Sequence, residues 1–401
     1  MIVNQVQDFI NLVSQQAYGE SAVAVTDQTG LVSLGDIVLS SDKSTDTFLR
    51  TLVDRIYYTI EGTRGYTSQF GDFVMHTSDY GCVLQKIRVK PMKAVESVQY
   101  DLTAGDTIDQ YVITKPDVIQ KLFQGRNVWE IDITIPEQGL QDAFLSFETM
   151  GAFIDAIFMA ISNSMEQQIE NSARAAVTNF MAEKIYSYAQ AQSGLQVVHT
   201  LQQYNAAFGT SLTAQQALTD GAYLKWSSRL INLFISRLRF QSQLFNAEKM
   251  TNFTPEDYVR VIMLADYTTA AQYYLQSDTF HNDLTSLPHY TEVPYWQGSG
   301  LDYSFESTSA IDVITSSGNT VKQDGIICLL ADVEAIGMMC NRRRLRTSPP
   351  NAKGEYINYF QKAEIRYYND LSENGIVFTL TDTPFTIANQ DTQASTGKKA
   401  K

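Results

Sequence analysis

The stretch that decides the fold runs from Asp142 to Phe180 and reads DAFLSFETMGAFIDAIFMAISNSMEQQIENSARAAVTNF. Its apolar residues recur every three or four positions: Phe147, Met150, Ile154, Ile157, Ile161, Met165, Ile169, Ala173, Ala176 and Phe180. This spacing keeps one face of an α-helix apolar, and no proline interrupts it. The stripe lacks the flanking Glu/Lys pairs of a coiled coil. We therefore expect a single spine helix over about residues 145–190, roughly 60 Å long.

The N-terminal region shows only weak helical patterns. Residues 1–45 combine a short amphipathic stretch with a run rich in Ser, Thr, Asp and Gly, which predicts an extended arm with little core of its own. Residues 46–60 have apolar residues at helical spacing after Asp46 and Thr47, either of which could cap a short helix.

Residues 60–100 have the pattern of an extended hairpin. Lys86, Arg88 and Lys90 alternate with apolar residues, which predicts a strand with one cationic face. Four glycines punctuate the segment before and at the start of this strand, so we expect a long two-stranded hairpin that projects from the body. An isolated hairpin is marginally stable in water, so we expect it to lie on a neighbouring molecule.

Further elements follow from similar patterns. Val128 to Ile135 alternates strictly, with Trp129 and the three isoleucines on the buried face, and Pro136 ends the strand. A second amphipathic helix is predicted over 224–245 and another over 270–287. Residues 258–265, after a helix start at Pro255, could be a helix or a buried strand. Residues 325–330 predict a buried strand.

The C-terminal part contains a dense arginine cluster, which we define as Arg342, Arg343, Arg344 and Arg346. A Pro-Pro-Asn turn and a long aromatic run follow it, ending in the apolar stretch 376–380. A nucleic-acid patch is one interpretation. The chain is acidic, however, and has no second basic segment of similar density, which favours a salt-bridge cluster within or between subunits. The planar guanidinium of arginine suits paired binding of carboxylates.

The composition points to protein interfaces. The formal net charge is −14, which disfavours contact with nucleic acid or anionic lipid by the protein as a whole. Charged residues make up 18% of the chain, and it contains 22 tyrosines. A surface poor in charge and rich in tyrosine is typical of protein–protein interfaces. A lightly charged soluble domain is the alternative.

Targeting and covalent cross-links leave little trace in the sequence. Cys82, Cys328 and Cys340 are odd in number and widely spaced, which indicates neither a disulfide framework nor a zinc site and suits a reducing compartment. The N-terminus lacks the pattern of a signal peptide. The most apolar window, 150–161, is too short to cross a bilayer. We expect a soluble protein made inside the cell, with no membrane association.

No pattern of residues indicates catalysis. The chain has no Gly-x-Gly-x-x-Gly, Walker loop, Gly-x-Ser-x-Gly or His-Glu-x-x-His pattern. A Ser-x-x-Lys at 40–43 lies in the polar arm, and His281 and His289 lack a second pair of metal ligands. Glu148 and Asp155 could share a helix face, where solvation or pairing with arginines is favoured over acid–base chemistry. We expect no enzyme activity, no cofactor and no metal.

Three stretches carry a resemblance to a known family: Leu52-Val-Asp-Arg55, the segment 142–148 leading into 153–157, and the pattern over 346–380. Together with the order of the predicted elements, they make the chain similar to the major capsid proteins of tailed bacteriophages. The greatest similarity is to those of small short-tailed phages with protein-primed replication. The resemblance implies the α+β fold of the Hong Kong 97 type.

The resemblance also implies a domain plan. An N-terminal arm and short helix would occupy 1–59 and an extended loop 60–100. The peripheral domain would comprise 101–194, with the spine helix, and 346–386. An axial domain would span 195–345, and 387–401 would be a disordered tail.

The function implied by the resemblance is mechanical. Many copies would form pentamers and hexamers of an icosahedral or prolate shell that encloses double-stranded DNA without sequence-specific binding. A separate scaffolding protein and a portal would be partners. The protein would be located in the virion after assembly in the cytoplasm of the host bacterium.

We expect an intersubunit interface to involve ten residues: Arg342, Arg343, Arg344, Arg346, Lys86, Arg88, Lys90, Tyr66, Phe70 and Phe73. Three other classes of function remain open from the sequence. An encapsulin-like shell around cargo enzymes would keep the fold. A soluble hydrolase would have a polar pocket, and a tail or adhesin component would form trimers or fibres.

Overall fold

The computed structural model describes most of the chain. The described residues are 3–19, 24–41, 43–52, 70, 73, 84–92, 94, 103–105, 109, 111–123, 127–191, 194–277, 287–298, 302–349, 351, 353–381 and 386–389. The chain divides into two compact units, each built from three segments. Unit 1 comprises Met1–Gly81, Arg126–Ala173 and Met338–Arg366, and unit 2 comprises Cys82–Gly125, Arg174–Gly337 and Tyr367–Lys401.

The predicted spine helix is confirmed as α5, Phe147–Ala191, with 45 residues. Its residues up to Ala173 belong to unit 1, and those from Arg174 belong to unit 2. From Met150 to Phe180 the apolar positions of the predicted stripe are buried along both parts, apart from Ile169, which is half-buried. A helix of this length forms because the apolar stripe stays on one face and is covered throughout.

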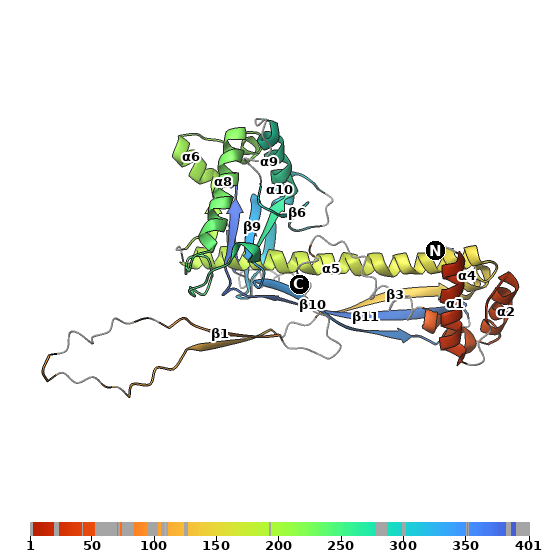
Figure 1. The fold of residues 1–401 in the computed structure, drawn as a ribbon. Helices are drawn as coiled ribbons and strands as arrows, with labels where there is room; N and C mark the ends of the chain where they lie inside the picture. Colours follow the sequence, from red (N-terminus) through yellow and green to blue (C-terminus); the bar gives the residue numbers. More distant parts are fainter. Residues whose placement is uncertain are drawn as a thin grey trace, which may run out of the picture. The chain divides into compact units, whose positions relative to one another are not determined.

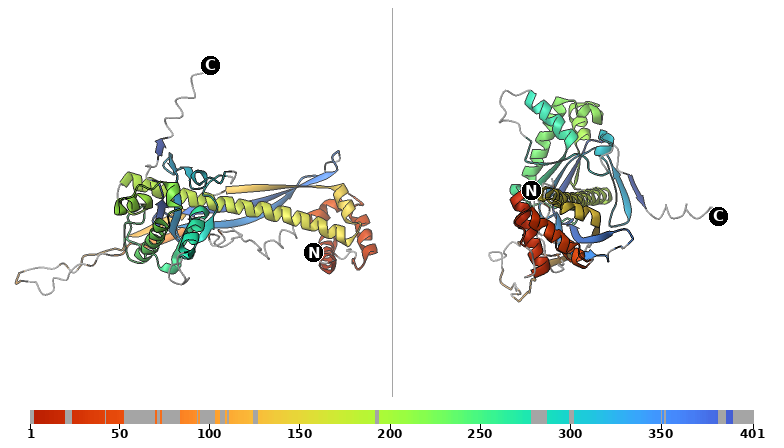
Figure 2. Two further views of the ribbon diagram at one scale, coloured as in Figure 1. Left: turned by 90° about the horizontal axis from the view of Figure 1, so that it is seen from above. Right: turned by 90° about the vertical axis from the view of Figure 1, so that its right-hand side faces the viewer.

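Unit 1 combines N-terminal helices with a three-stranded sheet. Its elements are α1 (Val3–Tyr18), α2 (Gln28–Val38), a helix over 43–52, β3 (Asn127–Pro136), α4 (Glu137–Ala143), the first part of α5, most of β10 (Ile336–Thr347) and most of β11 (Tyr356–Asn369). The strand order is β10-β11-β3. Figures 1 and 2 show α1, α2 and α4 near the start of α5, with β3 and β11 running beside this part of the helix.

The prediction of an extended N-terminal arm is wrong. Residues 3–18 and 28–38 are helical, and their buried side chains belong to the core of unit 1: Val6, Ile10, Val13, Leu31, Leu34 and Val38. The Asp27 side chain accepts a hydrogen bond of 2.7 Å from the Gly30 amide and caps α2. The polar composition of this region thus reflects helix caps and solvent-facing positions around an apolar stripe.

The short helix predicted over 46–60 is described as far as residue 52. It begins by residue 43, so the predicted caps Asp46 and Thr47 lie inside the helix. There the Thr47 hydroxyl donates to the carbonyl of Lys43, four residues earlier. Residues 53–60 lie outside the described residues.

The strand prediction for β3 is confirmed. Its exposure alternates, with Ile135 buried and Trp129, Ile131 and Ile133 half-buried, while Glu130 and Asp132 on the other face are exposed. β3 pairs antiparallel with β11, and Ile133 lies opposite Tyr359. On the exposed face, Lys362 forms a cross-strand ion pair of 2.9 Å with Glu130.

Unit 2 is built around a five-stranded sheet of order β4-β12-β9-β5-β6. These strands are β4 (Val197–His199), β12 (Gly375–Thr379), β9 (Ile326–Asp332), β5 (Val259–Leu264) and β6 (Thr291–Val293). β9 is buried along its whole length, as predicted for 325–330. The region 258–265 forms a 3-10 turn (η4, Glu256–Tyr258) followed by β5, so the strand alternative is the right one.

The helices of unit 2 pack on this sheet (Figure 1). They are α6 (Thr200–Phe208), α7 (Ala214–Ala217), α8 (Gly221–Leu238), α9 (Ala265–Ser277) and α10 (Phe305–Thr308). α8 ends at Leu238, seven residues before the predicted end at Phe245. α6 and α7 lie between β4 and α8 in the chain.

A second small sheet of unit 2 has the order β13-β8-β7, from β7 (Ile311–Ile314), β8 (Asn319–Gln323) and β13 (Thr386–Asn389). The side chain of Gln297 pairs with the edge strand β7: it donates to the Asp312 carbonyl at 2.9 Å and accepts from the Asp312 amide at 2.6 Å. The predicted disordered tail, 387–401, is wrong for its first three residues, because 387–389 belong to β13 and pair with β8. Residues 390–401 lie outside the described residues.

The predicted hairpin is present with a different partner strand. β1 (Leu84–Val89) pairs antiparallel with β2 (Val118–Phe123), in unit 2. The sequence prediction placed both strands within residues 60–100. The described part of the hairpin therefore runs from 84 to 123.

Candidate assembly site

The candidate site is the β1–β2 hairpin, whose two faces differ in chemistry. On one face lie Lys86, Arg88, Ile119, Lys121 and Phe123, which are all half-buried. Lys86 and Lys121 are directly opposite each other in the antiparallel register. Two like charges in this position are destabilising unless an anion lies between them.

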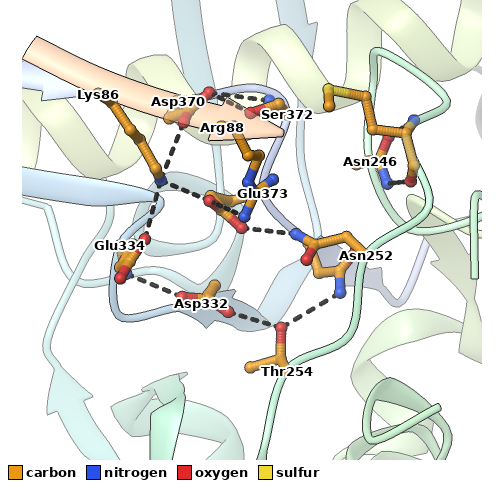
Figure 3. Close-up of polar contacts among 12 residues, drawn as sticks. Lys86, Arg88, Asn246, Asn252, Thr254, Asp332, Glu334, Asp370, Ser372 and Glu373 are labelled. Atoms are coloured by element: carbon orange, nitrogen blue, oxygen red, sulfur yellow. Dashed lines mark hydrogen bonds and ion pairs between the residues drawn. The ribbon is translucent and has the colours of Figure 1, made fainter. Parts of the chain in front are cut away.

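Asp370 supplies that anion. Its Oδ1 lies 2.9 Å from Lys121 Nζ, and its Oδ2 lies 3.1 Å from Lys86 Nζ. The Asp370 side chain is fully buried. A single carboxylate thus bridges the two strands of the hairpin (Figure 3 shows Asp370 next to Lys86).

Glu373 is the second buried anion of the cluster. It accepts hydrogen bonds from Lys86 and, at 2.5 Å, from Arg88. Its other oxygen, Oε2, accepts a bond of 2.6 Å from the side-chain amide of Asn252. Both carboxylate oxygens are therefore satisfied, which is what burial of a charge requires.

We call residues 370–374 the acidic turn; it joins β11 to β12. The Asp370 side chain accepts bonds from the Ser372 amide at 3.1 Å and the Ser372 hydroxyl at 2.7 Å, a local pattern typical of Asp in turns. Gly375 ends the turn, where a Cβ atom would lie 2.6 Å from the ring of Phe180. The sequence Asp-Leu-Ser-Glu-Asn-Gly thus encodes both the turn and its two anions.

Further polar residues extend the cluster (Figure 3). Glu334 lies 3.0 Å from Lys86 Nζ. Glu248 pairs with Lys121 on the other strand. Asp332 accepts a bond of 2.6 Å from Thr254, and burial raises the pKa of its carboxyl group.

The pKa values of Asp370, Glu373 and Lys86 are all shifted in the direction that favours the charged form, because each group faces opposite charges. Burial alone would raise the pKa of Asp370, but hydrogen bonds from Ser372 and Lys121 and the charge of Lys86 outweigh it and lower the pKa well below its usual range. Burial would also raise the pKa of Glu373, but the hydrogen bonds and charges of Lys86 and Arg88 outweigh it and lower the pKa. Burial would lower the pKa of Lys86, whereas Glu373 and Asp370 raise it.

Lys184, on the second part of α5, lies beneath the acidic turn and is completely buried. Its ammonium group donates to the main-chain carbonyls of Glu373 (2.7 Å), Phe245 (3.3 Å) and Leu371 (3.4 Å). Nζ also lies 5.0 Å from the centroid of the Phe180 ring. Burial lowers the pKa of Lys184 to about 7, and the charges of Asp370, Glu373 and Glu248 offset only part of this effect.

The other face of the hairpin is apolar and open. Ile87 is 62% exposed, Val89 56%, Val118 52% and Leu122 53%. Beyond the strands, Met92, Tyr111, Val112 and Ile113 are also exposed, at 69–83%. Several large apolar side chains exposed on one face are typical of an interaction site.

The structure places the predicted interface residues in several environments. Lys86 and Arg88 bind acids of their own chain, and Lys90 forms an exposed pair of 2.6 Å with Asp117. Phe70 and Phe73, in unit 1, are buried, with their ring centroids 5.5 Å apart. Tyr66 lies outside the described residues.

The arginine cluster lies in β10, an edge strand of the unit 1 sheet. Arg346 is exposed. The side chains of the other three arginines lie outside the description, and the interface role of all ten predicted residues remains a prediction.

Sequence reasoning missed Asp370, Glu373 and Lys184. A signal for the first two was available: two acids lie in a short polar turn between two apolar strands, in a chain with one alternating cationic strand. Lys184 had no such signal, because a single lysine in a helical pattern is normally interpreted as a solvent-facing residue.

Sites for metals and membranes are not indicated by the described part of the chain. No group of three or more His, Cys, Asp or Glu residues there could hold a metal ion. Among the described helices, none combines the length and apolarity needed to cross a bilayer. Cys328 is a buried free thiol whose pKa is raised by burial.

Comparison with known proteins assigns the family. The model of the Phi29-like phage major capsid protein family matches residues 9–379. The chain belongs to this family, and the predicted α+β major capsid fold of the Hong Kong 97 type is thereby confirmed. It is a structural protein of the phage capsid shell, located in the virion, and assembles with other capsid subunits.

Solved structures with similar chains are also phage particles. The capsid of Staphylococcus phage Andhra gives 10% identity and a TM-score of 0.47, covering 78% of this chain and 84% of the other. A structure of the head fiber and inner core protein of bacteriophage P68 gives 12% identity and a TM-score of 0.48, covering 78% of this chain and 85% of the other. The capsid of cyanophage Pam1 gives 10% identity and a TM-score of 0.42, covering 79% of this chain and 93% of the other.

These TM-scores are below 0.5, so the family match carries the assignment. No curated protein matches the chain. The comparisons contain no support for the encapsulin-like alternative, since the matched family is a phage family.

Proposed function

We propose that this chain forms the pentamers and hexamers of a closed icosahedral or prolate shell, and that the β1–β2 hairpin is the arm that binds each subunit to the next. The apolar face of the hairpin is the observation that supports this most strongly. Ile87, Val89, Val118 and Leu122 are each more than half exposed. Burying such side chains against a neighbour contributes about 25 cal/mol per Å² of apolar area.

The two faces of the hairpin have separate roles in this proposal. The cationic face holds the hairpin to its own subunit through Asp370 and Glu373. The apolar face is then presented outward, to a second copy of the chain. A two-stranded hairpin does not need to be stable alone when both of its faces are covered.

The domain plan is part of the proposal. The extended loop is built by β1 and β2, so we assign it to about 84–123 in place of the predicted 60–100. Residues 101–194 and 346–386 outside this loop, together with the N-terminal helices, form the peripheral domain. Residues 195–345 form the axial domain around the five-fold and six-fold axes.

The arginine cluster is proposed as a second contact between copies. Strand β10 is at the edge of its sheet, and Arg346 is exposed. The chain carries 44 acidic and 30 basic residues, so a second copy offers more carboxylates than basic groups. Arginine binds carboxylates with both of its terminal nitrogens, which gives directional contacts.

The remaining partners follow from the capsid role. The shell encloses double-stranded DNA without sequence-specific contacts, and the net charge of −14 suits a lining that does not retain DNA. A separate scaffolding protein and a portal direct closure. Assembly takes place in the cytoplasm of the host bacterium, and the protein catalyses no reaction.

Electron microscopy of hairpin variants tests this function. The variant Ile87→Glu places a charge in the apolar face, and Gln120→Glu places one at the directly opposite position of the same face, where the side chain is already polar. We expect wild type and Gln120→Glu to form shells or tubes with the scaffolding protein, and Ile87→Glu to remain as small oligomers. Normal shells from Ile87→Glu would contradict the proposed role of the hairpin.

A further inference from the structure

The acidic turn does not hold the hairpin alone. A second segment, residues 245–252, also takes part. Its Glu248 pairs with Lys121 of the hairpin, and the side-chain amide of its Asn252 donates a hydrogen bond of 2.6 Å to Glu373. The two segments contact each other through main-chain bonds, from the Ala247 amide to the Leu371 carbonyl at 3.1 Å and from the Gly375 amide to the Phe245 carbonyl at 2.9 Å. The surface on which the hairpin lies, which we call its seat, is therefore made of two irregular loops, 245–252 and 370–374.

Lys184 bonds to both loops at once. It donates to Phe245 in one loop and to Leu371 and Glu373 in the other. An ammonium group has three donors, and these three carbonyls use all of them. The Nζ atom also lies 5.0 Å from the centroid of the Phe180 ring, one helical turn earlier on α5.

Lys184 is the fourth basic group of the cluster. Lys86, Arg88 and Lys121 come from the hairpin and face four carboxylates, those of Asp370, Glu373, Glu248 and Glu334. Because burial lowers the pKa of Lys184 to about 7, it adds only part of a positive charge at neutral pH, and its main contribution is its hydrogen bonds. A buried lysine is retained only where it is paired and fully hydrogen-bonded, and a methionine in its place would leave three buried carbonyls without this donor.

We propose that Lys184 is a positioning residue for assembly: by holding the two loops together, it fixes the seat on which the hairpin lies. The inference rests on the proposed role of the hairpin as the assembly arm. It adds that the orientation of the arm is set from the spine helix, by a residue that does not touch the arm.

Hydrogen exchange of the full-length chain before assembly tests this inference. The variants are Lys184→Met, which removes all three donors, and Lys184→Gln, which keeps amide donors and removes the charge. Thr200→Val is the control, because it deletes a buried hydroxyl of the same unit that bonds to Thr379 at 2.9 Å, away from the hairpin.

The inference predicts a local effect. In Lys184→Met, amide exchange of residues 84–89 and 118–123 rises at least about tenfold, with a smaller rise in Lys184→Gln, while the central strand β9 is unchanged. Thr200→Val leaves the hairpin at the wild-type rate. Two results would overturn the inference. One is an amide exchange rate of the hairpin in Lys184→Gln that equals the wild-type rate, and the other is an equal rise of the exchange rate in the hairpin and in β9.

A variant on the hairpin side covers the case in which changes at Lys184 prevent folding. Arg88→Gln alters a half-buried side chain, so the subunit is expected to fold. Reaction of Lys184 with an amine-acylating reagent should then be several times faster than in wild type, because coupling between two sites is reciprocal. An unchanged rate contradicts the inference. The failure of the proposed function would be seen separately, in the assembly of Ile87→Glu.

Discussion

Two ion pairs on the same hairpin differ in almost every physical respect. Glu373, paired with Lys86 and Arg88 at the base, is 1% exposed. Lys90 and Asp117, at the end of the strands, are 46% and 63% exposed. A buried carboxylate without its partner costs several kcal/mol, whereas an exposed pair contributes about 0–1 kcal/mol. The hairpin is thus held firmly at its base and weakly at its distal end.

The largest expected effect comes from removing the buried charge. Glu373→Gln leaves Lys86 and Arg88 without a main counter-charge and should lower the free energy of unfolding by about 3 kcal/mol. Urea denaturation of the purified subunit measures this change. A loss below about 1 kcal/mol would show that the cluster does not stabilise the hairpin base.

The pH dependence of Lys184 is expected to be the next largest effect. Its pKa is about 7 in the folded chain and about 10.4 in an unfolded one, so the unfolded state binds more protons between these values. The free energy of unfolding should therefore rise with pH above 7, by up to about 1.4 kcal/mol per unit, relative to Lys184→Met. Equal pH slopes for wild type and the variant would contradict this account.

Acid should weaken the base of the hairpin in a different window. The pKa values of Asp370 and Glu373 are lowered on folding, so their contribution is present above about pH 4 and is lost as the pH falls through their folded values. Hydrogen exchange at pH 3 and pH 6, corrected for intrinsic rates, should show loss of protection in β1 and β2 before β9. Simultaneous loss in all three strands would speak against a local effect.

The smallest effect is expected at the exposed end. Asp117→Asn removes the partner of Lys90 and should change the free energy of unfolding by no more than about 0.5 kcal/mol. The same urea experiment serves as the measurement, with Glu373→Gln alongside. A loss comparable to that of Glu373→Gln would remove the distinction between the base and the distal end.

Local periodicity explains which elements were predictable. α5, β3 and β9 have patterns that persist over their whole lengths, and each was predicted. The N-terminal helices were missed because their apolar positions, such as Leu31 and Leu34, are interspersed with Ser, Thr and Gly. The partner of β1 was also missed, since strand pairing depends on long-range contacts that a local pattern does not contain.

The candidate site was predictable only in part. The alternation of Lys86, Arg88 and Lys90 indicated a cationic strand face, and the structure shows its first two members bound to Glu373. The anions come from a turn more than 280 residues away in sequence. Lys184 requires knowledge of three main-chain carbonyls in loops without regular structure, which the sequence does not contain.

We infer that the hairpin lies on its own subunit through its charged face and on a neighbouring copy through its apolar face. Hydroxyl-radical footprinting of free subunits and assembled shells can distinguish this arrangement from others. Met92 and Tyr111 are reactive and exposed in the subunit, and Met263 is buried as an internal reference. We expect oxidation of Met92, Tyr111 and Ile87 to fall several-fold on assembly. Equal oxidation of these residues in subunits and shells would contradict it.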